Sequence, residues 1–147
     1  KYSNLILDTV WRITNISSSL VDSLTFNQYY QAEQNATATL FLKMGLPYIS
    51  DYGYSFSSND VDRTVAVNSI DFGKIDFSWM YNDYAVDFGL IWTMDHDDTS
   101  PYIIYKPGIA GAINVYQGGV FPTFHIQANT QVKSGNGSQS SPYRLAV

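Results

Sequence analysis

The densest group of polar side chains lies directly after an apolar stretch, in the segment WTMDHDDTSPY (residues 92–102). Asp95, His96, Asp97 and Asp98 place three carboxylates and one imidazole within four consecutive residues. In a loop, alternate carboxylates can converge on a hard cation such as calcium, which prefers several oxygen ligands. Asp95, Asp97 and Asp98 are therefore candidate calcium ligands. A plain acidic turn is the alternative, because the glycine and the bidentate glutamate of a helix–loop–helix calcium site are absent.

The chain contains no recognisable catalytic motif. A serine nucleophile needs a histidine that a carboxylate orients, and the GxSxG elbow of many hydrolases does not occur in the sequence. The second histidine, His125, lies in the apolar stretch PTFHIQ and is expected to belong to a sheet. The many aspartates supply candidates for glycoside hydrolysis without singling out a pair. The sequence thus predicts a protein that is not an enzyme, with a glycan-active hydrolase as a further alternative.

Aromatic residues mix with aspartates and asparagines between residues 79 and 105. Exposed aromatic rings beside carboxylates and amides form surfaces that sugars and partner proteins bind. The alternative is that the tryptophans belong to the core, above all Trp92 in the apolar stretch LIWTM. The residues predicted to bind a ligand are Trp79, Tyr81, Asn82, Trp92, Asp95, His96 and Tyr102.

Composition narrows the classes of partner. Residues 51–98 hold ten acidic and two basic side chains, a local net charge of −8, which argues against a nucleic-acid groove. That acidic segment is either a solvated face or a surface for a cationic partner. The absence of cysteine excludes disulfides, a thiol nucleophile and a cysteine-ligated metal. No run of about eighteen apolar residues occurs, so this domain is expected to make no membrane contact itself.

The elements that position these side chains are mostly short strands. Phe26, Tyr29, Tyr30 and Glu33, at three- and four-residue spacings after a capping threonine, predict a helix over residues 25–35. A strand is expected near residues 4–14, and a loop over residues 46–64. Further short strands, paired antiparallel, are predicted at 64–70, 74–81, 83–94, 100–106, 111–117, 120–126, 129–135 and 142–147. At 147 residues, the chain is expected to form a single compact α+β domain, β-dominated, over residues 1–147.

Four stretches carry a resemblance to a known family. They are GLPYISDYGYS, FSWMYND, IWTMDHDDTSP and the closure GGVFPTFHIQANTQVKSGNGSQSSPYRL. In this order they resemble an uncharacterised C-terminal domain of Firmicute surface proteins that often follows a type IV pilin-like segment. The family pattern is GLxYxSDYGYA, then WTLSP, then GVxPvxxL with GxGTxxxPYxL, and the order holds from about residue 41 to residue 145. TMDHDD departs from WTLSP, which puts the usual role of that turn in doubt.

The resemblance implies an extracellular module displayed on a Gram-positive cell surface or pilus, with an anchor upstream of Lys1. Such a module is expected to bind a glycan or a protein of the host or cell surface. The alternative is a structural subunit of a pilus or surface assembly, whose partners are neighbouring subunits. The layout is also similar to C-type-lectin-like folds, although the calcium–sugar tripeptides EPN, QPD and WND are absent. In the closure, Gly135 and Gly137 are expected to allow a tight turn with positive φ.

Overall fold

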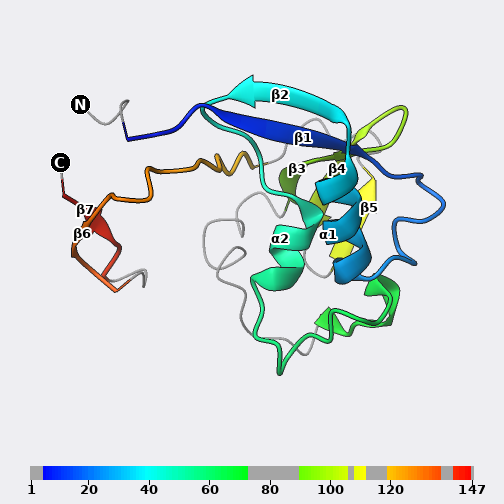
Figure 1. Ribbon diagram of the computed structural model, residues 1–147. Helices are drawn as coiled ribbons and strands as arrows, with labels where there is room; N and C mark the ends of the chain where they lie inside the picture. Colours follow the sequence, from blue (N-terminus) through cyan, green and yellow to red (C-terminus); the bar gives the residue numbers. More distant parts are fainter. Residues whose placement is uncertain (1–4, 73–89, 106–107, 112–118, 137–140, 147) are drawn as a thin grey trace.

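The computed structural model describes residues 5–72, 90–105, 108–111, 119–136 and 141–146. In this part of the chain, a mixed five-stranded sheet of order β2-β1-β3-β4-β5 is covered on one side by two helices, α1 and α2 (Figure 1). The α+β, strand-dominated class that the sequence predicted is confirmed. The elements are β1 (Thr9–Asn15), α1 (Phe26–Asn35), β2 (Ala38–Leu42), α2 (Ile49–Tyr54), the 3-10 turn η1 (Val67–Ser69), β3 (Leu90–His96), β4 (Pro101–Tyr105), β5 (Gly108–Gly111), β6 (Val132–Ser134) and β7 (Arg144–Leu145).

Helix α1 lies where the sequence predicted it. Its N-cap is Thr25: the amide of Gln28 donates to Thr25 Oγ1 at 3.1 Å, and the amide of Thr25 donates to Gln28 Oε1 at 2.9 Å. This reciprocal bonding satisfies two amides that have no partner within the helix. Phe26, Tyr29 and Glu33 follow at helical spacing and are buried. The buried face of α1 therefore carries a carboxylate into the interior.

Helix α2 occupies part of the stretch that was expected to be a loop. Six residues that include a glycine are too few to be a stable helix on their own. Asp51 accepts a hydrogen bond from the amide of Tyr48 at 2.9 Å, and the next two amides bond to carboxylates from other elements. For these six residues the loop prediction was wrong, because tertiary contacts, rather than local propensity, stabilise α2.

The sheet is mixed, although the sequence predicted antiparallel pairing. Thr14 and Asn15 of β1 pair in parallel with Asp95 and His96 of β3. The chain between β1 and β3 includes α1, β2 and α2, and such a long crossover permits parallel pairing. Strand β2, which the sequence did not predict, pairs antiparallel with β1 and forms one edge of the sheet.

The remaining strand predictions have mixed outcomes. Strands β4, β6 and β7 lie within predicted strands, whereas β1 and β3 overlap their predictions and each extends beyond its predicted C-terminal end. Residues 64–70 contain η1 instead of a strand, and residues 120–126 form isolated bridges without a continuous strand. The predictions for residues 74–81, for most of 111–117 and for the first part of 83–94 lie outside the described residues.

An aromatic cluster fills the space around α2. The ring of Tyr52 lies 4.9 Å from that of Phe56, 5.8 Å from that of Phe72 and 6.3 Å from that of Phe26. Tyr52 and Phe26 are almost completely buried. Gly53 permits this close approach, because a Cβ atom there would lie 2.1 Å from the Phe26 ring. The packing of α2 thus depends on a residue without a side chain.

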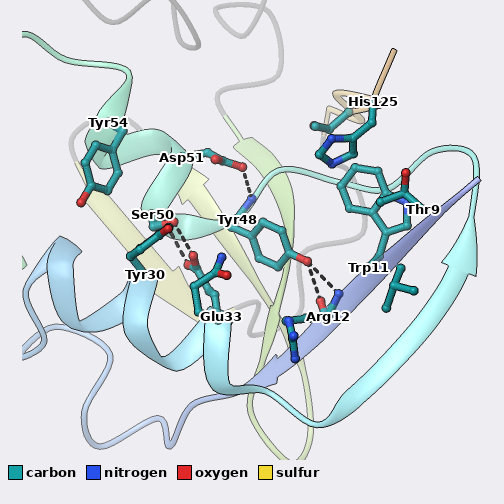
Figure 2. Close-up of a pocket in the computed structure, with 13 residues that line it drawn as sticks. Thr9, Trp11, Arg12, Tyr30, Glu33, Tyr48, Ser50, Asp51, Tyr54 and His125 are labelled. Carbon is teal, nitrogen blue, oxygen red and sulfur yellow. Dashed lines mark hydrogen bonds between the residues drawn. The ribbon is translucent and has the colours of Figure 1, made fainter. Parts of the chain in front are cut away.

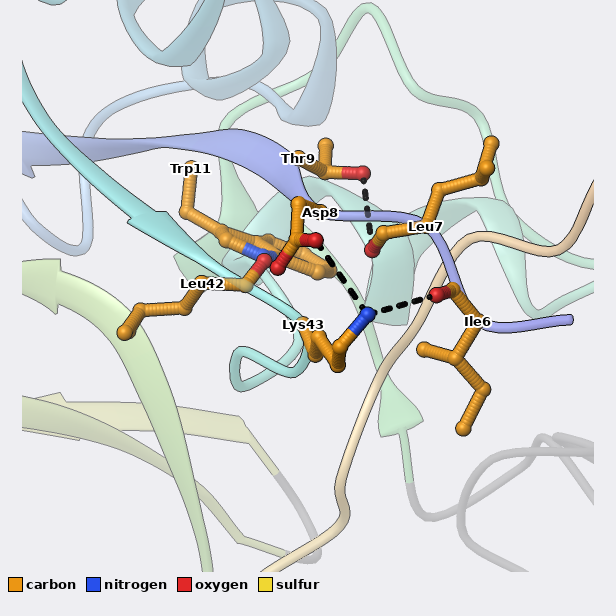
Figure 3. Close-up of polar contacts among 7 residues, drawn as sticks. All are labelled: Ile6, Leu7, Asp8, Thr9, Trp11, Leu42 and Lys43. Carbon is orange, nitrogen blue, oxygen red and sulfur yellow. Dashed lines mark hydrogen bonds and ion pairs between the residues drawn. The ribbon is translucent and has the colours of Figure 1, made fainter. Parts of the chain in front are cut away.

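Residues 119–127 tie distant parts of the chain together. Gly45 and Thr123 exchange two backbone hydrogen bonds of 2.9 and 3.0 Å, and the amide of Leu7 donates to His125 O at 2.9 Å. Lys43, at the end of β2, also reaches the N-terminal segment: its Nζ donates to Ile6 O at 3.1 Å and pairs with Asp8 at 3.2 Å (Figure 3). The exposed ion pair is worth little, so the backbone bonds provide most of the attachment.

The hairpin of β6 and β7 lies apart from the two helices, on the side of the N-terminal end (Figure 1). Gly135, directly after β6, has φ of 94°, which confirms the positive φ predicted there. Gly137 lies outside the described residues. None of the described helices is long and apolar enough to span a bilayer.

Candidate functional site

A pocket of about 690 Å³ opens between β1, α1 and α2. We call it the tyrosine pocket, after Tyr30, Tyr48 and Tyr54 in its wall (Figure 2). The same wall includes polar side chains, among them Gln34 and Asp51. A concave site with aromatic surface and a few convergent polar groups is the usual form of a ligand site.

Two exposed tyrosines form one side of the pocket. The rings of Tyr30 and Tyr54 are 41% and 46% exposed and meet edge to face, with centroids 5.9 Å apart. Tyr54 is held by a hydrogen bond from its hydroxyl to Asn27 Oδ1 at 3.0 Å and by the guanidinium of Arg63, 4.6 Å from the ring centroid. These two contacts hold the Tyr54 ring in place, and the Tyr30 ring packs against it. The pair contributes aromatic surface to the wall of the pocket.

Tyr48 joins the pocket to β1. Its hydroxyl donates to Arg12 O and accepts from the amide of Arg12, both at 2.9 Å (Figure 2). Burial raises the pKa of Tyr48, so the hydroxyl keeps the proton that it donates. The guanidinium of Arg12 donates to Ala36 O, at the C-terminal cap of α1, at 2.6 Å. A cation at this end of a helix is favourable. The hydrogen bond of Arg12 to Ala36 therefore connects β1 to α1.

Trp11 and His125 form another part of the wall, with ring centroids 5.2 Å apart. The indole Nε1 of Trp11 donates to Leu42 O at 2.9 Å, which orients the buried ring. Burial raises the pKa of nearby Asp51, while the hydrogen bond from the amide of Tyr48 and the charge of His125 lower it. The pocket therefore combines an acceptor carboxylate with aromatic surface.

Two buried carboxylates lie at the N-terminal end of α2, and one of them, Glu33, also lines the pocket. Asp95 Oδ2 accepts from the amide of Ile49 at 2.7 Å, and Glu33 Oε1 accepts from the amide of Ser50 at 3.0 Å. The hydroxyl of Ser50 also donates to Glu33. Glu33 and Asp95 are 2% and 0% exposed. Glu33 comes from α1 and Asp95 from β3, so the two carboxylates connect three elements.

One side of this arrangement is incompletely bonded. Asp95 Oδ1 and the hydroxyl of Thr14 are buried, and neither has a hydrogen-bond partner among the described residues. The two residues are neighbours in the parallel ladder of β1 and β3. Burial raises the pKa of Asp95 and outweighs the opposing effects of the Ile49 amide and of the Thr14 hydroxyl. A buried carboxylate oxygen without a donor disfavours the ionised form of Asp95.

The structure places the residues predicted to bind a ligand in different environments. Tyr102 is fully buried, and its hydroxyl donates to Ile16 O at 2.8 Å, so its prediction as a surface ligand residue was wrong. The alternation of β4 directs this ring into the core. Trp92 is partly buried on β3, where it pairs with Ile103 of β4. Trp79, Tyr81 and Asn82 lie outside the described residues.

The three candidate calcium ligands do not converge. Asp95 points into the core, whereas Asp97 Oδ1 accepts hydrogen bonds from the backbone and hydroxyl of Thr99 and from the amide of Ser100, all at 2.7–2.8 Å. Asp98 accepts from Asn15 Nδ2 at 2.6 Å. Within the described residues, no group of three or more histidine, cysteine, aspartate or glutamate side chains is arranged to hold a metal ion.

The physical reason is the strand that precedes the turn. Strand β3 ends at His96, so its alternation directs Asp95 inward. Asp97 then begins the turn to β4, where its carboxylate organises the backbone. His96 is partly buried, and its Nδ1 lies 2.5 Å from Asp97 O. The contacts of Asp97 are those of an acidic turn, which was the alternative to a calcium site.

The pocket combines residues that the sequence did not connect. Tyr48, Asp51 and Tyr54 fall in the stretch that was expected to be a loop, and Trp11 falls in the predicted first strand. The one available signal was Tyr30, which shares the helical spacing of Phe26 and Glu33 and therefore lies beside the buried face of the predicted helix. Helical periodicity alone does not identify it as exposed or as part of a pocket. Comparison of the chain with protein-family models, with curated proteins and with solved structures finds no match.

Proposed function

We propose that the chain is a binding module and that it recognises a glycan or a protein through the tyrosine pocket. One observation carries the proposal: exposed aromatic rings and polar side chains line a single concavity of about 690 Å³. Tyr30 offers an exposed ring, and Asp51 and Gln34 lie in the same wall. Aromatic surface beside hydrogen-bonding groups suits both the faces and the hydroxyls of sugars and the side chains of a peptide.

We further propose that the module acts outside the cell, on a Gram-positive surface or a minor pilin-like protein. The support is the resemblance of the GLPYISDYGYS stretch and of the C-terminal closure to surface-protein domains. That first stretch contains Tyr48, Asp51 and Tyr54, so one of the segments that carry the resemblance also supplies part of the pocket. A C-type-lectin-like fold is the finer form of this proposal, and it rests on layout alone.

The experiment that tests the proposal is a glycan and host-protein array, followed by affinity measurements on variants. Tyr30→Ala removes exposed aromatic surface from the pocket and is expected to weaken binding about tenfold or more. Tyr143→Ala is the matched control, because Tyr143 is 60% exposed and lies beside β7, outside the pocket. Thermal unfolding of both variants checks that the fold is retained.

Trp79→Ala distinguishes the pocket from the aromatic segment that the sequence favoured. Binding that depends on Tyr30 and not on Trp79 supports the pocket. Binding that is lost in Trp79→Ala, with an unchanged melting temperature and an unaffected Tyr30→Ala, would assign the ligand to the other segment and overturn the proposal.

A second candidate function is assembly with neighbouring subunits, and strand β2 favours it. All five residues of this edge strand are exposed, and Phe41 is 68% exposed. An exposed apolar edge strand is a template for pairing with another chain. Sedimentation at increasing concentration tests this candidate: association that Phe41→Lys abolishes and Asn59→Lys preserves would support it. A monomer at all concentrations would count against it.

A further inference from the structure

The amides of Ile49 and Ser50 are neighbours in the chain, and each bonds to a different buried carboxylate. Consecutive Cα atoms are about 3.8 Å apart, so the two carboxylates accept from neighbouring points of the chain, and the charge of Asp95 acts on Glu33. Both accept hydrogen bonds from the start of α2, and no cationic side chain forms an ion pair with either among the described residues. Two adjacent buried carboxylates without a cation cannot both remain ionised at low cost.

We infer that Glu33 and Asp95 form a proton-holding clamp on the start of α2, which makes the anchoring of α2 and of its wall of the tyrosine pocket dependent on pH. The clamp joins α1 to α2 through Glu33 and joins β3 to α2 through Asp95. Tyr54 and Asp51 lie on the same short helix, so they move with it. This inference concerns the support of the pocket and requires no ligand.

The surroundings of the clamp favour retention of a proton. Burial raises the pKa of Glu33 to about 8, and repulsion from the charge of Asp95 adds to this effect. Hydrogen bonds from Ser50 offset part of the increase. Burial likewise raises the pKa of Asp95 to about 7, although the Ile49 amide opposes the effect. At neutral pH the pair therefore holds at least one proton.

Other ionisable groups face the clamp from each neighbouring element. Tyr29 lies on α1, Asp51 on α2, His96 on β3 and Tyr102 on β4. Tyr48 at the start of α2 also faces it, and Arg12 lies on β1, where its guanidinium bonds to Ala36 O. The carboxylate of Asp51 opposes a second ionisation, whereas His96 favours it.

The direction of the pH effect follows from the raised pKa values. In the unfolded chain both carboxyl groups ionise near pH 4. Their contribution to stability is therefore fully present at about pH 4 and is lost as the pH rises through about 7 to 8. Between about pH 5 and pH 7, the unfolding equilibrium constant is expected to increase about tenfold for each unit rise in pH, for each proton that only the folded state holds.

Thermal and denaturant unfolding across this pH range tests the clamp. The wild-type protein is expected to lose stability as the pH rises, and Glu33→Gln is expected to flatten that dependence because the amide does not titrate. Asp60→Asn is the matched control, since Asp60 is exposed and lies outside the clamp; it should keep the wild-type dependence. A wild-type stability that is flat from about pH 5 to pH 8, or a slope unchanged in Glu33→Gln, would overturn the inference.

A measurement on the wild-type protein keeps the inference testable if the variant does not fold. NMR titration of the side-chain carboxyl carbons is expected to show that Glu33 and Asp95 change state near neutrality. The amide of Tyr29 bonds within α1 and serves as the internal reference. As Glu33 and Asp95 ionise, the rates of amide hydrogen exchange at Ile49 and Ser50 should increase relative to the rate at Tyr29. Titration of both carboxyls near pH 4, or a constant exchange ratio, would contradict the clamp. Neither readout involves a ligand, so a failed clamp and a failed binding proposal give distinct results.

Discussion

The role of each acidic residue depends on what its carboxylate contacts. Glu33 and Asp95 are buried against the amides of α2, whereas Asp97 organises a turn and Asp98 bonds to Asn15. The residue type is nearly the same in all four cases. The partners, and the distance from solvent, decide whether the carboxylate supports a helix, a turn or a surface contact.

At this scale the clearest prediction concerns Thr25, the N-cap of α1. Thr25→Ala removes the acceptor for the Gln28 amide and is expected to reduce the free energy of unfolding by about 1 kcal/mol. Thr25→Ser keeps a hydroxyl at this position and should restore most of the loss. Urea denaturation of the three proteins measures the difference. Equal stabilities would show that the capping box contributes nothing.

Helix α2 illustrates how an element can form without strong local preference. Its first amides bond to Asp95 and Glu33 from other elements, and Gly53 allows Phe26 to pack directly against its backbone. These contacts replace the stability that a short helix lacks. The tyrosine pocket depends on this support, since α2 supplies part of its wall.

The corresponding prediction concerns the hydroxyl of Ser50. Ser50→Ala removes one hydrogen bond to Glu33 but leaves the backbone bond, and should cost about 1 kcal/mol of unfolding free energy. Because that hydroxyl lowers the pKa of Glu33, its removal should raise the pKa further. Ser58→Ala, at an exposed position, is the control. A downward shift of the Glu33 titration, followed by NMR, would contradict the assigned role.

For the whole molecule, burial of tyrosine in the core determines behaviour in alkali. Burial raises the pKa of Tyr102 to about 12, and it raises the pKa of Tyr29 as well, with nearby carboxylates adding to both effects. The hydroxyls of both residues donate to backbone oxygens, those of Ile16 and Val21. These residues stabilise the fold fully below about pH 10, where unfolded tyrosine ionises, and the contribution is lost above it.

Spectrophotometric titration of tyrosine measures this prediction. The exposed tyrosines, such as Tyr30 and Tyr143, should ionise first and reversibly. Tyr29 and Tyr102 should ionise only together with loss of structure, followed by circular dichroism. Tyr102→Phe removes one of the late-titrating groups and provides the control. Complete ionisation of the native protein near pH 10 would be inconsistent with the buried positions of the two rings.

By itself, the sequence determined the strand-rich α+β class, the bounds of α1, the positions of β3 and β4, and the turn at Gly135. Each of these depends on neighbours in the chain: a cap, a periodicity, or a glycine that adopts positive φ. Only the tertiary structure decided the parallel pairing of β1 with β3, the formation of α2, and the burial of Asp95 and Tyr102. Those features arise from contacts between residues far apart in sequence, which local patterns do not encode.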